Sequence, residues 1–441
     1  TNTNDDGPGS LRQALADAGA IAGLDIINFN IPGPPYTIQP ASPLPTIIDP
    51  VVIDGTTQPG YTDTPLIELD DTNAGATNVN GLAILSGGCT VRGLTIVKFS
   101  GSGVRSDGTG GNTVEGNYIG TNAAGSASLG NATGLCFFSP NNRIGGATAA
   151  SRNLISGNTI GVYIAGVDAT NNVVIGNYIG TNATGTGPLG NREGVFVWQA
   201  PNTTVGGITL GERNIISGNT EEGVGIYGPS TIVKGNLIGT DITGQVKVGN
   251  GWGIFVGSQN AVIGGTTAAE RNIISGNNGT GVIIRGDANT DVTGNTLKGN
   301  YIGTDITGGA KLGNTVGIFI ADAAHHNTIG GAGTGEGNVI SGSQSDGIWI
   351  VSRDALVSHH IIIQGNLIGT DKDGSLALGN ARYGINIEQA PNNTVGGTIS
   401  GARNIISGNG GDGVCISGAS STGNLIQGNF VGTARSGLVA L

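Results

Sequence analysis

The sequence predicts an all-β solenoid, in which short strands wind into coils that stack on one another. The main evidence is a motif of the form Gly-Asn-Tyr-Ile-Gly-Thr that recurs at intervals of 59 to 66 residues. Its copies begin at Gly116, Gly176, Gly235, Gly299, Gly365 and Gly428. Self-similarity at a fixed period is the signature of repeat architectures, because each repeat can bury its apolar side only against its neighbours.

A second motif alternates with the first. It has the form Arg-Asn-Ile-Ile-Ser-Gly-Asn, and its copies begin at Arg152, Arg213, Arg271 and Arg403, with a Gly-Asn-Val-Ile-Ser-Gly-Ser variant at Gly337. The long period therefore divides into two related halves of about 30 residues, a length suited to one coil each.

The alternation inside each half predicts strands with an inner and an outer face. In Gly-Val-Phe-Val-Trp, Val195 and Val197 point one way, whereas Phe196 and Trp198 point the other way. Gly, Asn, Asp and Thr stand between such runs and favour sharp corners. Parallel stacking of the coils then predicts Ile and Val columns inside and hydrogen-bonded Asn ladders at the corners.

Composition excludes several classes of protein. Glycine is abundant, with 84 residues in 441, but no Gly-X-Y period exists, so the chain is not a collagen. The net charge of −11 argues against a nucleic-acid partner, which needs a basic face. No apolar run has the length of a membrane span. Three widely spaced cysteines do not form a disulfide framework. The chain contains no Met, so we expect a processed chain or an excised fragment.

In chain order, residues 1–24 predict an N-terminal cap, with Ser10 capping a short helix from Leu11 to Ala18. Residues 25–110 predict irregular coils between Pro-rich turns, and residues 111–441 predict the regular array. We expect the three parts to form one continuous domain.

These coils resemble the right-handed parallel β-helix proteins of the pectate-lyase-like superfamily, in particular bacterial cell-surface proteins with many Asn-x-Ile-x-Gly-Asn coils. The resemblance covers residues 25–441. It implies a single-stranded right-handed parallel β-helix and a secreted or cell-surface location. It carries over no catalytic residue, because the pectinase Asn-Thr-Asp motif with a downstream His-Gly and the acid cluster of calcium-dependent lyases are both missing.

Aromatic residues gather at the predicted outer positions, although they make up only 4% of the chain. The strip comprises Tyr163, Phe196, Trp198, Tyr227, Phe255, Phe319 and Trp349. One interpretation is a surface that binds a glycan or a neighbouring subunit, and the alternative is that inserts fold back and cover it. A second outer column comprises Tyr118, Tyr178, Leu237, Tyr301, Leu367 and Phe430. All but Phe430 are predicted to pack against a Leu or Val of the insert that follows, as a small satellite core.

Charged residues follow the outer strand positions of neighbouring coils in the same region. Arg285, Asp322, Arg353, Asp354 and Glu388 are candidate catalytic residues, since polysaccharide lyases and hydrolases combine carboxylates with a cation and an aromatic platform. The alternative is a solvated rim of salt bridges.

Histidines and insert acids are the candidate metal ligands. His325-His326 and His359-His360 fall at the same corner of adjacent coils, where imidazoles could bind a transition metal or replace an asparagine ladder. Asp241, Asp305 and Asp371 are aligned, but they recur only every second coil, so Asx-turns are favoured over a calcium site. We expect no cofactor; calcium is possible but unsupported by a motif.

Together these features predict an extracellular structural or adhesive module that presents the aromatic strip to a glycan or to neighbouring subunits, with self-association possible. Two alternatives stay open: a carbohydrate-active enzyme, either polysaccharide lyase or glycoside hydrolase, and a subunit of an extracellular filament.

Overall fold

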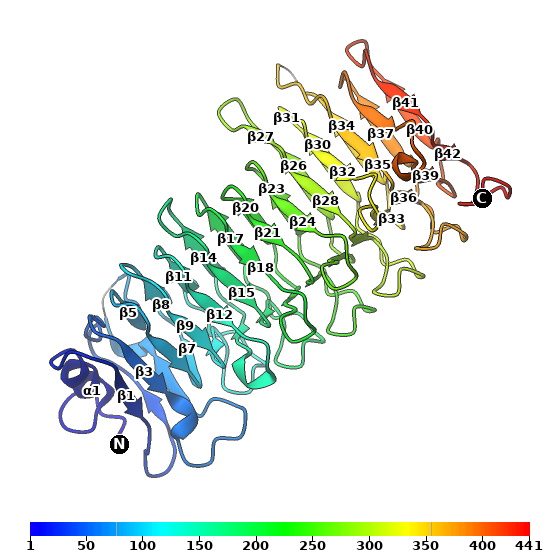
Figure 1. Ribbon diagram of the computed structural model, residues 1–441. Coiled ribbons are helices and arrows are strands. Elements are labelled where there is room, and N and C mark those ends of the chain that lie inside the picture. The colour runs from blue at the N-terminus through cyan, green and yellow to red at the C-terminus, as the bar shows by residue number, and fades with distance from the viewer. Residues whose placement is uncertain (76, 354) are drawn as a thin grey trace. The chain divides into compact units, whose positions relative to one another are not determined.

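The computed structural model describes residues 1–75, 77–353 and 355–441 (Figure 1). The chain forms two compact units, Thr1–Thr220 and Glu221–Leu441, here called the first and the second unit. The division into a cap, irregular coils and a regular array within one domain stays a prediction.

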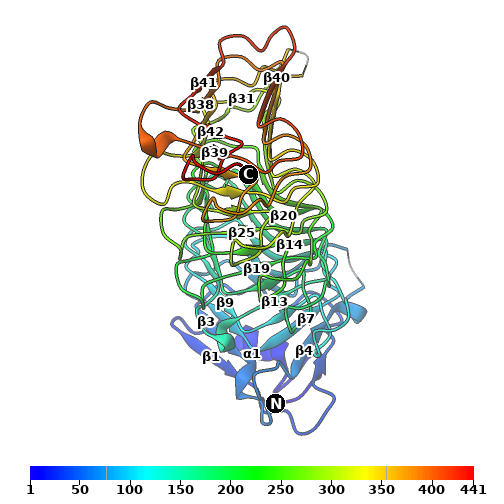
Figure 2. The same ribbon diagram turned by 90° about the vertical axis from the view of Figure 1, so that its right-hand side faces the viewer.

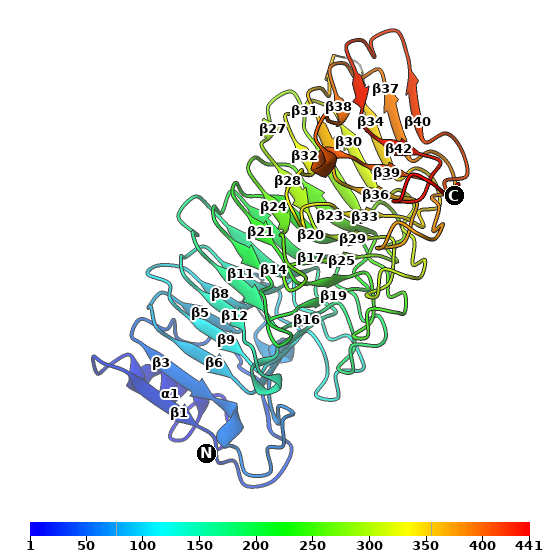
Figure 3. The ribbon, with the colours of Figure 1, turned by 45° about the vertical axis from the view of Figure 1, so that its right-hand side comes forward.

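The first unit begins with the predicted helix, α1 (Leu11–Ala18). The Ser10 hydroxyl accepts a hydrogen bond from the Gln13 backbone N–H, which satisfies one of the free donors at the start of the helix. Leu11 and Leu15 are buried, and Figure 3 shows α1 beside β1, the first strand of the coils. The helix therefore covers the open edge of that first coil.

Three parallel sheets, which we call A, B and C, build the coils of the first unit. Sheet A contains β1 (Asp25–Asn28), β3 (Val51–Asp54), β6 (Thr90–Arg92), β9 (Thr113–Glu115), β12 (Arg143–Gly145), β15 (Val173–Ile175) and β18 (Thr204–Val205). Sheet B contains β2 (Thr37–Ile38), β4 (Ile67–Asp70), β7 (Leu94–Val97), β10 (Tyr118–Ile119), β13 (Leu154–Ile155), β16 (Tyr178–Ile179) and β19 (Ile215–Ile216). Sheet C contains β5 (Leu82–Ile84), β8 (Ser102–Ser106), β11 (Thr133–Phe137), β14 (Ile160–Ala165) and β17 (Glu193–Trp198).

The second unit repeats this arrangement. Its sheet A contains β21 (Ile232–Val233), β24 (Val262–Gly264), β28 (Thr296–Lys298), β32 (Thr328–Gly330), β35 (Ile362–Gln364), β38 (Thr394–Gly396) and β41 (Leu425–Gln427). Its sheet B contains β22 (Leu237–Ile238), β25 (Ile273–Ile274), β29 (Tyr301–Ile302), β33 (Val339–Ile340), β36 (Leu367–Ile368), β39 (Ile405–Ile406) and β42 (Phe430–Val431). Its sheet C contains β20 (Glu222–Tyr227), β23 (Trp252–Val256), β26 (Val282–Arg285), β30 (Ile318–Ala321), β34 (Ile348–Val351), β37 (Ile385–Glu388) and β40 (Val414–Ser417).

Among the described residues, each coil contributes one strand to each sheet in turn, except the first coil, with β1 and β2, and the last, with β41 and β42, which have no strand in sheet C. Figure 2 shows β38 and β41 of sheet A on one side of the second unit and β40 of sheet C on the other. The chain is a parallel β-helix, as predicted. Smaller elements decorate the turns: β27 (Val292–Thr293) pairs with β31 (Ala324–His325), and 3₁₀-helices span Gly55–Thr57, Asp71–Asn73, Ala149–Ser151 and Ser400–Ala402.

Aliphatic columns fill the interior of each unit, because the register places equivalent residues of successive coils directly above one another. In sheet A of the first unit the column runs Ile53, Val91, Val114, Ile144, Val174, Val205, and every member is fully buried. Complete burial of one such side chain contributes about 1.5–3 kcal/mol.

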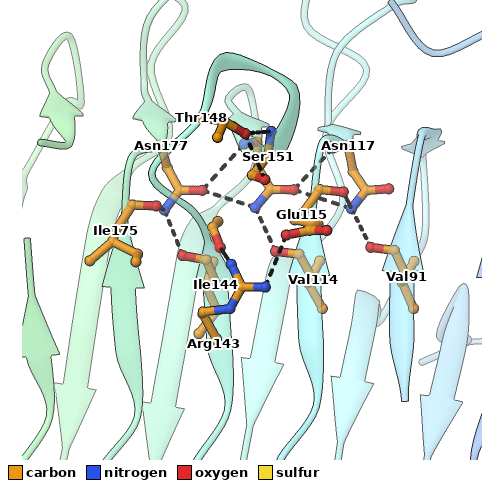
Figure 4. Close-up of polar contacts among 12 residues, drawn as sticks. Val91, Val114, Glu115, Asn117, Arg143, Ile144, Thr148, Ser151, Ile175 and Asn177 are labelled. Atoms are coloured by element: carbon orange, nitrogen blue, oxygen red, sulfur yellow. Dashed lines mark hydrogen bonds and ion pairs between the residues drawn. The ribbon is translucent and has the colours of Figure 1, made fainter. Parts of the chain in front are cut away.

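Asparagine ladders hold the corners, as predicted (Figure 4). Asn153 is fully buried, and its amide nitrogen donates to the Val114 carbonyl at 2.8 Å and to Asn177 Oδ1 at 2.9 Å. Its own oxygen accepts from the backbone and side-chain nitrogens of Asn117, at 3.0 and 3.1 Å. One side chain thus satisfies polar groups in three successive coils, which an aliphatic residue could not do.

We predict that Asn153→Ala lowers the free energy of unfolding by about 3 kcal/mol, because it leaves several buried donors and acceptors without partners. Urea unfolding of the purified chain measures the change. The matched control is Asn73→Ala, which removes an exposed side chain with one bond of 3.2 Å to Gln39 and should change stability by less than about 0.5 kcal/mol. Equal effects of the two substitutions would contradict the role assigned to the ladder.

Candidate functional site

The outer face of sheet C in the second unit carries an aromatic column. Strand pairing aligns Phe255, Ile283, Phe319 and Trp349 in successive coils. The rings of Phe319 and Trp349 meet edge to face, with centroids 5.1 Å apart. Tyr227 of β20 stacks on Phe255 at 5.2 Å. The alignment that the sequence predicted is therefore present, whereas a binding role for it stays a prediction.

These side chains line a groove of about 270 Å³. Four aromatic residues line it, and the other lining residues are the apolar Ile283 and Val316 and the polar Thr280 and Arg285; the aromatic ones are Trp252, Phe255, Phe319 and Trp349. Trp252 is 40% exposed at this groove, and whether inserts cover the rest of the strip stays a prediction.

Trp252 is not among the residues predicted from the sequence, because the predicted strip contains only positions after the glycine that opens each strand. Trp252 stands immediately before that glycine, at the first position of β23. The chain has only three tryptophans, so an alignment of their positions with the repeat would have placed Trp252 beside the predicted strip.

A second aromatic group lies on sheet C of the first unit. The ring centroids of Tyr163 and Phe196 are 5.8 Å apart, and Phe196 stacks on Trp198 at 6.2 Å. Trp198 is 41% exposed. The continuous strip predicted from Tyr163 to Trp349 includes residues of both units, so its continuity stays a prediction.

The candidate catalytic residues divide into separate contacts. Arg285 Nε donates to Asp322 Oδ2 at 2.7 Å, and Asp322 is almost completely buried at the end of β30. The Arg353 guanidinium lies 5.3 Å from the centre of the Phe319 ring. Glu388 lies on β37, three strands from Arg285, at a distance of about 14 Å for a strand spacing of about 4.8 Å. Asp354 lies outside the described residues.

These contacts give the charged residues structural partners. Arg285 and Asp322 form an ion pair beside the groove, and Arg353 forms a cation–π contact with a groove residue. A catalytic role for Arg285, Asp322, Arg353 and Glu388 stays a prediction.

The histidine pairs occupy one corner on adjacent coils, as expected from their spacing. His325 stacks on His359 with centroids 4.9 Å apart, and His326 stacks on His360 at 4.8 Å. Within each coil the two Nδ1 atoms approach one another, at 2.9 and 2.7 Å. His325 Nε2 also lies 3.1 Å from Asp291 Oδ1. No group of three converging ligand atoms among the described residues includes a histidine, and metal binding stays a prediction.

The second outer column, on sheet B, lies under side chains of the motifs. Tyr178 and Tyr301 are buried, as predicted. Their cover includes arginine, which the sequence analysis did not foresee: the guanidinium of Arg152 lies 4.3 Å from the Tyr178 ring centre, and that of Arg271 lies 4.1 Å from the Tyr301 ring centre. Arg152 and Arg271 are each the first residue of a copy of the second motif. The recurrence of arginine at this position is the sequence feature that could have predicted these contacts.

Comparisons with known proteins match no family model and no curated protein. Among solved structures, the periplasmic alginate epimerase AlgG is 13% identical, with a TM-score of 0.46 over 89% of this chain and 78% of its own. The Dettilon tailspike protein is 16% identical, with a TM-score of 0.47 over 93% of this chain and 66% of its own. The catalytic unit of a GH87 α-1,3-glucanase from Streptomyces thermodiastaticus is 15% identical, with a TM-score of 0.47 over 97% and 66%.

These likenesses transfer no site to the present chain, and its fold assignment rests on the strand pairings described above. None of the helices in the described residues has the length and apolar character that a bilayer crossing requires.

We predict a pH-dependent stability that originates in the histidine stack. Burial lowers the pKa of His359 below its ordinary value of 6.5, and the neighbouring imidazoles His325, His360 and His326 lower it further. The unfolded chain therefore binds a proton at a higher pH than the folded chain does, so stability falls as the pH drops below 6.5.

Thermal melts between pH 7.5 and pH 5.5 measure this effect above the range in which carboxylates titrate. His359→Asn should flatten the pH dependence over that interval, since asparagine suits such corners without titrating. Identical pH slopes for the wild type and the variant would contradict the assignment.

Proposed function

We propose that the chain is a carbohydrate-binding β-helix module, which holds a glycan in the groove on sheet C of the second unit. The observation that carries the proposal is the convergence of Trp252, Phe255, Phe319 and Trp349 on one open groove. Aromatic residues are scarce in this chain, and an exposed cluster of them marks a binding surface more often than a structural one.

The chemistry of the groove suits a sugar chain. A pyranose ring has apolar C–H faces that pack on aromatic rings, while its hydroxyls need polar partners at the edge. Here Thr280 and Arg285 are the polar lining residues. Phe319 and Trp349 lie on neighbouring strands about 4.8 Å apart, which is nearly the interval of successive sugars in an extended glycan.

One contact supports a preformed site. The Asp322 carboxylate holds Arg285 from one side, which limits the conformations of the guanidinium before any ligand arrives.

The role proposed is passive and extracellular, as part of a structural or adhesive surface protein. Arg285 and Asp322 are engaged with each other, and Glu388 lies further along the sheet, so the groove contacts favour binding over acid–base chemistry. A neighbouring subunit is the other occupant that an aromatic groove could accept.

We predict that Phe319→Ala combined with Trp349→Ala weakens glycan binding by about tenfold or more, because both rings are lost from the groove. A panel of neutral and acidic polysaccharides, tested by affinity electrophoresis and by assays for new reducing ends and unsaturated products, measures binding and turnover together. Tyr383→Ala is the control, since this aromatic residue on the same unit does not line the groove. Both variants should keep the wild-type circular dichroism spectrum.

Three results would overturn this proposal. If the double variant bound glycan as tightly as the wild type, the groove would not be the glycan-binding site. New reducing ends or unsaturated products would favour the enzyme alternative. Failure to bind any member of the panel, with a concentration-dependent size that the double variant abolishes, would make a second copy of the chain the occupant.

A further inference from the structure

We propose that the second unit contains a separate cationic cleft that binds the charged groups of a short acidic oligosaccharide. The cleft has a volume of about 460 Å³ and lies over sheet B, where Tyr301, Val339, Leu367 and Ile405 line it. The aromatic groove lies on sheet C, so the two sites use different faces of the coils.

The charge of the cleft is opposite to that of the chain. The whole protein has 19 Lys and Arg residues and a net charge of −11. Four of these cations line the one cleft, namely Arg271, Lys372, Arg403 and Arg435, and no Asp or Glu is among the lining residues. Glu336, which stands between the lining residues Gly335 and Gly337, is paired with Lys298 Nζ at 2.7 Å.

The cleft forms at the one copy of the second motif that lacks the initial arginine. The second motif opens with arginine at 152, 213, 271 and 403, but with Gly337 in the intervening copy. The arginines at 271 and 403 each cover an aromatic ring of the next coil, whereas Gly337 has no side chain to cover Leu367. The loop before it, Gly331-Ala-Gly-Thr-Gly, is also small, so the space stays open.

An arginine would not fit at position 337 without a shift of the backbone. A Cβ atom at this position would lie 2.0 Å from the carbonyl oxygen of Gly365, which is closer than any real contact. The close approach of these two backbones therefore keeps the position glycine and the cleft open.

Two arginines are oriented before a ligand binds. Arg271 Nε donates to the Gly299 carbonyl and Arg403 Nε to the Gly428 carbonyl, each at 3.0 Å. Each guanidinium also stacks 4.1 Å from a ring centre. In the part of the chain that the structure describes, neither terminal nitrogen pair has a hydrogen bond or an ion pair, so both are available to an oxyanion.

The other two cations come from stacked inserts. At the second residue after Gly-Thr the earlier copies have Ala123, Ala183, Ile242 and Ile306, whereas the last two have Lys372 and Arg435. Lys372 N donates to the Gly308 carbonyl and Arg435 N to the Gly374 carbonyl, so successive inserts align these positions. Lys372 pairs with Asp373, but both are exposed, and such a pair is weak in water.

A short acidic sugar chain fits these features better than a nucleic acid does. Carboxylate or sulfate groups match the arginine forks, and the apolar floor of Val339, Leu367 and Ile405 suits the ring faces. A nucleic acid has a much denser line of charge and would be repelled more strongly by the net charge of −11 on the chain.

The test is calorimetric titration of the full chain with tetrasaccharides of galacturonate, mannuronate and chondroitin sulfate, with maltotetraose and sodium sulfate as separate probes. We expect at least one acidic tetrasaccharide to bind and the neutral one not to bind at this cleft. Lys372→Ala with Arg435→Ala should weaken that binding by about tenfold, and raised salt should weaken it further. Both residues are exposed, so folding should be preserved.

Matched variants separate this cleft from the groove of the proposed function. Lys247→Ala removes an exposed insert lysine that does not line the cleft, and it should leave binding unchanged. Phe319→Ala with Trp349→Ala should also leave it unchanged. Arg271→Lys keeps the charge but loses the planar fork, and should weaken binding of the acidic sugar.

The cleft proposal fails on any of three outcomes. Binding of sulfate as tight as that of the sugars would reduce the site to a simple ion site. If no acidic tetrasaccharide bound, the cleft would not be an acidic-sugar site, whatever the aromatic groove binds. The acidic sugar would be assigned to the groove if the Phe319 and Trp349 double variant lost binding while the Lys372 and Arg435 double variant bound as tightly as the wild type.

Discussion

The buried side-chain amide of asparagine is the interaction on which the rest of the structure depends. A coil that turns three corners in about 30 residues leaves backbone donors and acceptors inside each corner, where water cannot reach them. Asn177 shows the solution: it accepts from Asn153 and donates to the Ile144 carbonyl and to Asn214 Oδ1. The same arrangement runs through Asn272, Asn300 and Asn338 in the second unit. Because the side-chain amide both donates and accepts hydrogen bonds, the corners can be tight and the interior largely aliphatic.

This regularity explains why both proposed binding sites lie where the outer residues depart from the repeat. Coils contact mainly their neighbours, so a substitution on an outer position changes the surface without changing the core. Phe319 and Trp349 stand at positions where other coils have Ile283 or Asn386. Gly337 stands where other copies have arginine. In each case the inner residues stay Ile or Val, and the chemistry changes only outside.

The fold could be predicted from the sequence, because the repeat period, the alternation of residues in each strand and the asparagines at the corners all indicate the same stacking of coils. It located Phe255, Phe319 and Trp349 on one face, since strand register follows from the repeat. It did not reveal that Asp322 is buried against Arg285, or that Arg271 covers Tyr301, because long side chains choose partners in neighbouring coils through conformations that no period specifies. The cleft at Gly337 was equally hidden: a cavity depends on what two adjacent coils and two inserts leave unfilled.

The ladder also gives the stack a direction. Asn117 donates to Asn153, Asn153 to Asn177, and Asn177 to Asn214, always toward the following coil. In the second unit Asn338 donates to Asn366 and Asn366 to Asn404 in the same sense. The amide dipoles in each row are therefore aligned, and each bond polarises the next. A coil inserted backwards would set donor against donor at every corner, so such a protein can lengthen by duplicating coils only in one orientation.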